Sequence, residues 1–296
     1  MVGFRVFRTA AVVTGAVVGL TSAAYGLLNE QSKRAESVIG EPEGPPFNAD
    51  GVYLPDGSGP HPFGIGADPL RFAVIGDSSA AGLGVDLPSQ LPGVLLARSL
   101  AEESGRSVLL TTYAIVGATT RDLADQVDQA LADPPDVALV IIGANDVTDH
   151  LSIRESAKLL EAQLVRLRSA DAAVVMGTCP DLGAVRPLAQ PLRSVARAWS
   201  LLLGKAQLAA VLRADCAPVA LAELLSPEFI ARPDDLFSAD RFHPNAAGYE
   251  AAAAVLLAPL CVAAGVWTSA PPETPVTPLP TRSRSLPSVR TRLAAG

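Results

Sequence analysis

The sequence predicts an α/β protein, a three-layer α/β/α sandwich built on a parallel sheet of five strands. Short apolar runs alternate with longer segments of helical period through the middle of the chain. Continuous apolar runs of this length are typical of parallel strands that helices cover on both faces. Their regular alternation with helices indicates crossover units wound into one open sheet.

Five apolar runs are the predicted strands, and a helix is predicted after each of them. The strands are expected at residues 71–75, 108–114, 136–142, 172–176 and 217–221. The helices are expected at residues 88–104, 119–132, 153–169, 191–213 and 245–264. No internal repeat is visible, so the sheet is predicted to belong to a single domain.

The composition of the two ends places that domain at residues 69–266, a length that can bury a substantial core. Residues 31–68 are rich in Pro, Gly and acidic residues, which predicts a linker with Phe63 or Ile65 packed on the domain edge. Residues 267–296 combine Pro with Thr, Ser and Arg. So little apolar surface predicts a disordered tail.

Residues 1–30 are interpreted as a membrane-targeting segment. No charged residue occurs from Thr9 to Leu28, and Arg5 and Arg8 precede this run. The run is long enough to span a bilayer, and its basic flank is typical of the cytoplasmic side. Small residues at 22–24 also fit a signal-peptidase site, so an anchor and a cleaved signal peptide both stay open. Either one predicts an exported domain, whereas a buried amphipathic helix would need a polar face that the run lacks.

Charge and cysteine content narrow the possible partners. The formal net charge is −7, and the basic residues form no stripe interleaved with aromatics, which argues against nucleic acid as a partner. Cys179, Cys216 and Cys261 have no metal-ligand spacing. They are predicted to be small buried hydrophobic residues, although export would permit one disulfide.

Four short polar segments, far apart in the chain, stand out from the apolar pattern. They are residues 76–82 (GDSSAAG), 117–120 (GATT), 143–146 (GAND) and 240–244 (DRFHP). The first three follow the first three predicted strands, and the carboxyl ends of parallel strands share one edge of the sheet. Ser78, Gly117 and Asn145 are therefore expected to meet at that edge.

The fourth segment supplies the only histidine with a catalytic neighbourhood. His243 has an acid, Asp240, three residues before it in a turn that ends in proline. This spacing lets the carboxylate bind one ring nitrogen and fix the tautomer, while the other nitrogen faces Ser78. His61 falls in the predicted linker and His150 in a predicted surface loop, so both are expected to be solvated.

In order and content, the four segments resemble the conserved blocks of the SGNH/GDSL hydrolase family of serine esterases and lipases, including exported actinobacterial members. The resemblance covers roughly residues 70–265 and implies a flavodoxin-like sheet with strand order 2-1-3-4-5. It also implies a Ser78, Asp240 and His243 triad, and an oxyanion hole formed by Ser78, Gly117 and Asn145. The family usually has Leu or Ile where this chain has Ser79, so Ser79 is the competing nucleophile.

The leading hypothesis is a serine carboxylesterase that hydrolyses short- to medium-chain acyl esters through an acyl-enzyme. The alternatives are an acyltransferase or deacetylase acting on cell-envelope lipid or glycan, and a non-catalytic envelope-binding domain. The complete set of site residues argues against a non-catalytic domain. A phosphate-binding protein would need a Gly-rich loop with Lys near the first strand, which is missing. No cofactor, metal or obligate protein partner is predicted, and the expected contacts are an ester substrate and the membrane.

Overall fold

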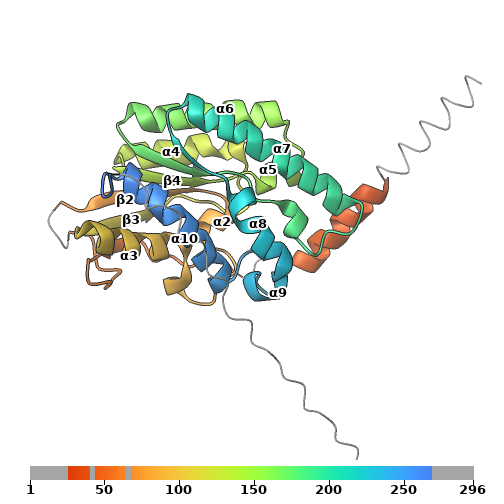
Figure 1. The fold of residues 1–296 in the computed structure, drawn as a ribbon, viewed down its shortest axis with the longest axis horizontal. Coiled ribbons are helices and arrows are strands. Elements are labelled where there is room, and N and C mark those ends of the chain that lie inside the picture. Colours follow the sequence, from red (N-terminus) through yellow and green to blue (C-terminus); the bar gives the residue numbers. More distant parts are fainter. Residues whose placement is uncertain (1–25, 41–43, 65–67, 269–296) are drawn as a thin grey trace, which may run out of the picture.

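The computed structural model describes residues 26–40, 44–64 and 68–268 as a sheet covered by helices on both faces (Figure 1). The predicted membrane-targeting run, except for its last residues, and the predicted tail after residue 268 lie outside the described residues. The three-layer α/β/α class predicted from the sequence is confirmed.

The sheet has six strands in the order β1-β3-β2-β4-β5-β6. Their bounds are Gly51–Tyr53 (β1), Leu70–Gly76 (β2), Val108–Thr112 (β3), Val137–Ile141 (β4), Ala173–Gly177 (β5) and Ala217–Val219 (β6). Strands β2 to β6 pair in parallel, with Val74 opposite Thr112 on one side and Leu139 on the other. Numbered among themselves, these five strands have the predicted order 2-1-3-4-5.

The sixth strand lies in the segment expected to be a linker. Strand β1 pairs antiparallel with β3, and its Val52 and Tyr53 are buried in the described protein. The Tyr53 hydroxyl donates a hydrogen bond to the Ala49 carbonyl at 2.6 Å. Phe63, expected to pack on the domain edge, is 68% exposed, and Ile65 lies outside the described residues. The linker prediction is thus corrected here: Pro- and Gly-rich flanks hid a strand of only three residues.

The segment before β1 is also partly ordered on the domain. Residues 26–39 form a helix. The amide side chain of Gln31 donates to the carbonyl of Gln190 at 2.6 Å and accepts from the backbone N–H of Leu192 at 3.1 Å. This helix therefore contacts the start of helix α7 (Leu192–Arg213) and does not behave as a free spacer.

Helices α3, α4, α6, α7 and α10 divide between the two faces of the sheet (Figure 1). Helices α3 (Pro92–Ser104) and α10 (Ala246–Ala263) pack on one face, through residues such as Leu96 and Leu260. Helices α4 (Leu123–Ala132), α6 (Ile153–Ser169) and α7 cover the other face. All five were predicted, because each carries an apolar stripe toward the buried strands.

Besides the helix at residues 26–39, four further α-helices of the described residues were not predicted, and these four lie at the carboxyl edge of the sheet. They are α2 (Ser78–Ala81), α5 (Ala144–Thr148), α8 (Leu221–Ala231) and α9 (Pro233–Leu236). Helix α8 contains Pro227 and begins two residues after β6, where the sequence was interpreted as strand. These elements frame the polar segments singled out above.

Two helices and the three cysteines account for part of the apolar character of the chain. Within the described residues, α7 and α10 are long and apolar enough to cross a membrane, judged by length and composition alone. Both nevertheless pack on the sheet, through Val211 and Leu256 among others, with 33% and 28% of their apolar windows buried in the described protein. Cys179, Cys216 and Cys261 are free and buried, as the small hydrophobic residues that the sequence predicted.

Candidate active site

Strand β2 ends in a tight turn that presents Ser78 at the carboxyl edge of the sheet. Gly76 has φ of +144°, and a β-carbon there would lie 1.8 Å from the Ile141 carbonyl oxygen, so only glycine fits. The Asp77 carboxylate then accepts a hydrogen bond from the Ser79 N–H at 2.9 Å, which caps helix α2. As the first residue of α2, Ser78 has a backbone N–H without an intrahelical acceptor.

Ser78, His243 and Asp240 form one continuous chain of hydrogen bonds. The Ser78 Oγ lies 3.0 Å from His243 Nε2, and His243 Nδ1 lies 2.6 Å from Asp240 Oδ2. Ser78 and His243 are 6% and 8% exposed. Such a chain lets the imidazole accept the hydroxyl proton on one side while the carboxylate fixes its tautomer on the other.

The carboxylate of Asp240 is held by its own loop. Its Oδ1 accepts hydrogen bonds from the hydroxyl of Ser238 and from the N–H groups of Phe242 and His243, at 2.7 to 2.9 Å. Burial alone would raise the pKa of Asp240, but these bonds and the one from the His243 ring outweigh it and lower the pKa to about 2. Asp240 is therefore ionised, with Oδ2 free to face the imidazole.

Asn145 and Gly117 come together beside the nucleophile turn. The Asn145 side-chain Nδ2 donates one hydrogen bond to the Ala118 carbonyl at 2.9 Å, which leaves its second hydrogen for another acceptor. Gly117 directly precedes Ala118 and has φ of +80°. The same loop is tied to strand β2, because the Ile115 N–H donates to the Gly76 carbonyl at 3.0 Å. The three predicted oxyanion segments thus meet at one edge.

We expect Asn145→Ala to lower kcat for ester hydrolysis by about two to three orders of magnitude, because it removes one donor to the developing oxyanion. KM and thermal stability should change little, and steady-state kinetics with a melting curve would check both. Thr148→Ala, on the exposed side of the same short helix, is the matched control and should keep its turnover. An unchanged kcat with only KM raised would contradict the oxyanion role.

Two buried glutamines, which the sequence did not single out, hold the strand ends that carry the site. Gln126 on α4 accepts from the Gly76 N–H at 2.8 Å and donates to the Gly76 carbonyl at 3.0 Å. Gln207 on α7 accepts from the Cys179 N–H at 2.7 Å and donates to the Ile142 carbonyl at 3.0 Å. Both side chains are fully buried. Each gives hydrogen-bond partners to two buried backbone groups at the ends of the strands.

The carboxylate of Asp146, also missed, holds the loop that runs from Gly117 to Thr120. Its oxygens accept from the backbone N–H of Thr120 at 2.7 Å and from the Thr120 hydroxyl. Asp146 is fully buried, and it follows Asn145 directly. A polar residue on the apolar stripe of a helix would have indicated Gln126, and an Asp in a buried GAND turn would have indicated Asp146.

Asp77 is a buried acid whose ionisation costs stability. Burial raises its pKa to about 6 from 3.8, although N–H groups of Ser79 and Gly143 and the nearby His243 lower it in part. Between those values the folded state binds more protons than the unfolded state, so the unfolding free energy falls as pH rises through this window. An uncharged residue at position 77 would not show this fall.

We therefore compare the unfolding free energy of Asp77→Asn with that of the parent. The value for the variant minus that for the parent should rise by roughly 2–3 kcal/mol between pH 4 and pH 7. Urea denaturation at both pH values, each with parent and variant, measures the difference. A parent and variant that differ by the same amount at both pH values would show that Asp77 does not titrate in this window.

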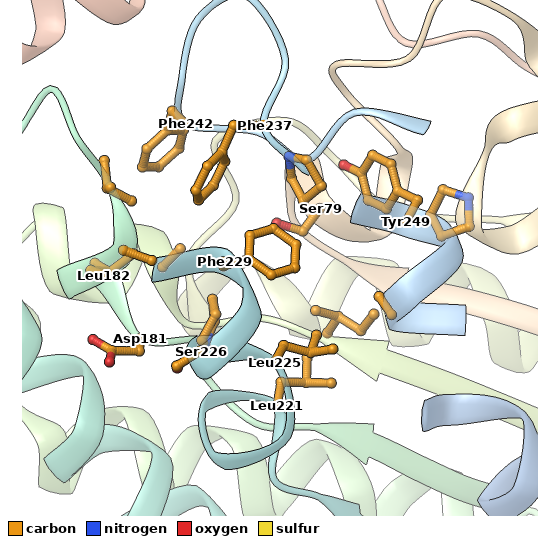
Figure 2. A pocket seen from close by; sticks show the side chains of 18 of the residues that line it. Ser79, Asp181, Leu182, Leu221, Leu225, Ser226, Phe229, Phe237, Phe242 and Tyr249 are labelled. Carbon is orange, nitrogen blue, oxygen red and sulfur yellow. The ribbon is translucent and has the colours of Figure 1, made fainter. Parts of the chain in front are cut away.

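The structure describes all three histidines, and of these only His243 bonds to Ser78. His61 lies beside strand β1 with its Nε2 3.0 Å from the Ser58 hydroxyl, and the His150 ring packs 5.9 Å from that of Trp199. Ser79 points its N–H at Asp77 and its side chain toward an apolar pocket (Figure 2). Among the described residues, no group of His, Cys, Asp and Glu side chains is arranged to hold a metal ion.

The fold and the site together define an α/β/α hydrolase of the SGNH type, in which the sheet edge gathers Ser, Gly, Asn and His. Residues 74–251 match the GDSL-like lipase/acylhydrolase family, and the chain belongs to this family. Membership places it among esterase- and lipase-type enzymes.

Relatives and solved structures agree with this assignment. The chain is 42% identical over 261 residues to the GDSL-like esterase Rv1075c of Mycobacterium tuberculosis, covering 84% of this chain and 81% of that protein. The lipase/acylhydrolase of Enterococcus faecalis shares the fold, with a TM-score of 0.53 and 21% identity over 63% of this chain and 93% of its own. The esterase EstA of Pseudoalteromonas sp. has a TM-score of 0.51 and 17% identity over 63% and 94%.

Proposed function

We propose that this protein is a serine carboxylesterase that hydrolyses short- to medium-chain acyl esters through an acyl-enzyme on Ser78. The observation that carries the proposal is the continuous hydrogen-bond chain from Ser78 through His243 to Asp240. A hydroxyl that shares its proton with an oriented imidazole is an activated nucleophile. The neighbouring Asn145 amide supplies a donor that is already oriented by Ala118.

In the first half of the reaction, the Ser78 Oγ attacks the ester carbonyl carbon while His243 Nε2 takes its proton. The carbonyl oxygen becomes negative and binds the N–H groups of Ser78 and Gly117 and the free hydrogen of Asn145 Nδ2. Asp240 stabilises the imidazolium through Nδ1. The bond to the alcohol oxygen then breaks, and His243 returns the proton to the leaving alcohol.

In the second half, water replaces the alcohol. His243 takes a proton from the water as its oxygen attacks the acyl carbon, and the same donors bind the oxyanion. The bond to Ser78 Oγ breaks, His243 protonates Ser78, and the carboxylic acid leaves. Every proton passes through His243 Nε2, which is the ring nitrogen that faces Ser78.

Fluorophosphonate labelling tests this chemistry, because a serine nucleophile displaces fluoride and keeps the phosphonyl group. Intact mass and peptide mapping should find one adduct on Ser78. The adduct should be absent in Ser78→Ala and still form in Ser79→Ala. An adduct on Ser79, or none at all on a folded and soluble protein, would overturn the nucleophile assignment.

We also propose that the enzyme acts outside the cytoplasmic membrane. The support is the uncharged run from Thr9 to Leu28 behind Arg5 and Arg8, a pattern that directs export. Fractionation of cells that express the full chain should find it in the membrane or wall, whereas a chain without residues 1–30 should stay in the cytosol. Full-length protein recovered mainly from the cytosol would refute export and leave the esterase proposal intact.

A further inference from the structure

An apolar pocket opens beside Ser79 and extends between helices α8 and α10 (Figure 2). Its volume is about 100 Å³. Apolar cavities of this order hold small hydrocarbon molecules without water. The pocket is therefore large enough for a short hydrocarbon chain.

The mouth of the pocket is built from the immediate neighbours of the site residues. Ser79 follows Ser78, Ala144 precedes Asn145, and Phe242 and Pro244 flank His243 in the chain. The Phe242 ring also packs edge-on against the His243 ring, with centroids 4.7 Å apart. Three separate segments of the active site thus converge on one opening.

Beyond the mouth, the walls are hydrocarbon. Leu225 and Phe229 on α8 face Ala252 and Leu256 on α10. Leu256 is fully shielded from solvent and Phe229 is 8% exposed, so the pocket reaches the apolar core between α8, α10 and the sheet. Burying each methylene of a substrate there is favourable, because apolar surface is removed from water.

Apart from Ser79, the polar side chains at the pocket wall are engaged within the protein. The Tyr249 hydroxyl donates to the Leu83 carbonyl at 2.8 Å, and the Ser226 hydroxyl donates to the Ala222 carbonyl. The Asp181 carboxylate accepts from the Gly183 N–H at 2.8 Å and pairs with Arg197 at 3.3 Å. Few hydrogen-bonding groups remain for a sugar, which would leave its own hydroxyls unsatisfied there.

We propose that this pocket binds the acyl chain of the ester, and that Ser79 at its mouth sets which chains can enter. The inference rests on the proposed esterase function. The acyl group stays bonded to Ser78 until water attacks, whereas the alcohol must return to solvent after the first step. The pocket runs from Ser79, next to Ser78, into the core. It is therefore suited to the acyl chain, which stays bonded to Ser78. The substrate class is an ester of an apolar acid.

Two variants narrow the pocket from different elements. Ser79→Leu fills the mouth, and Ala252→Leu adds bulk to the partly buried wall on α10 and leaves the nucleophile turn unchanged. Ala254→Leu is the matched control, since Ala254 is exposed on the same helix and does not line the pocket. For each protein, kcat/KM is measured with p-nitrophenyl acetate, butyrate, hexanoate and octanoate, together with fluorophosphonate labelling.

Both filling variants should lower the ratio of hexanoate to acetate kcat/KM by at least about tenfold, while Ala254→Leu keeps the parent ratio. A parent ratio in Ala252→Leu, in an enzyme that still cleaves acetate and takes the label, would overturn the pocket assignment alone. So would a loss of kcat/KM confined to hexyl acetate, assayed beside these esters, because that result would place the alcohol in the pocket. A parent enzyme without label or acetate cleavage would instead overturn the proposed function.

Discussion

Ser78→Ala should lower kcat for p-nitrophenyl acetate by about four orders of magnitude or more, with no loss of thermal stability. The hydroxyl is the only group on this turn that bonds to His243 Nε2, and without it the proposed acyl-enzyme cannot form. The residual rate should reflect the oxyanion donors and binding alone. Active-site titration and steady-state kinetics on the purified domain measure the loss.

The neighbouring serine gives this prediction its sharpest control. Ser79 lies on the same turn, but its N–H bonds to Asp77 and its side chain lines the pocket. Ser79→Ala should therefore change substrate preference and still form the acyl-enzyme. The reverse pattern, with activity kept in Ser78→Ala and lost in Ser79→Ala, would show that the adjacent residue is the nucleophile.

The layers of the fold were predictable because many residues together produce each sequence pattern. Buried parallel strands need continuous apolar runs, and the helices that cover them need apolar stripes, so each long element was visible in the sequence. Strand β1 was not visible, because Gly51–Tyr53 is too short for a period and lies among prolines and glycines. Its place in the sheet depends on the edge that β3 offers.

Only those site residues were predictable whose type is restricted by the chemistry of ester hydrolysis. Ser78, Asn145, Asp240 and His243 belong to segments with fixed spacing, and the structure places all four at one edge of the sheet. Gln126 and Gln207 were not predicted, because a glutamine on a helix is usually solvated. Their role appears only when α4 and α7 pack against strand ends that need hydrogen-bond partners.

These buried amides explain how a site built on loops can be rigid. Gly76 is bound through both backbone groups by Gln126, and its carbonyl also accepts from Ile115 in the oxyanion loop. A movement of the nucleophile turn would break several buried bonds at once, each costing about 1–3 kcal/mol when left unsatisfied. Preorganised donors of this kind avoid reorganisation during the reaction.

Asp240→Asn should lower kcat by about four orders of magnitude while the fold is kept. Oδ2 accepts from His243 Nδ1 at 2.6 Å, whereas an amide in that place would present N–H groups to the ring. The imidazole would then carry its proton on Nε2 and could not accept one from Ser78. Because its pKa is about 2, Asp240 is ionised at every pH suited to the assay, so the loss should persist from pH 5 to 8.

Ser238→Ala is the control. It separates the effect of the Asp240 charge on the His243 tautomer from the effect of a disturbed loop. It removes one of three hydrogen bonds to Asp240 Oδ1 and leaves the Oδ2 contact with His243 in place. Its kcat should fall by no more than about one to two orders of magnitude, since a single hydrogen bond to a charged group contributes about 1.5–3 kcal/mol. If Asp240→Asn kept kcat within tenfold of the parent, the carboxylate would serve the loop and not the imidazole. The proton relay through Asp240 would then have to be abandoned, although Ser78 and His243 would still be paired.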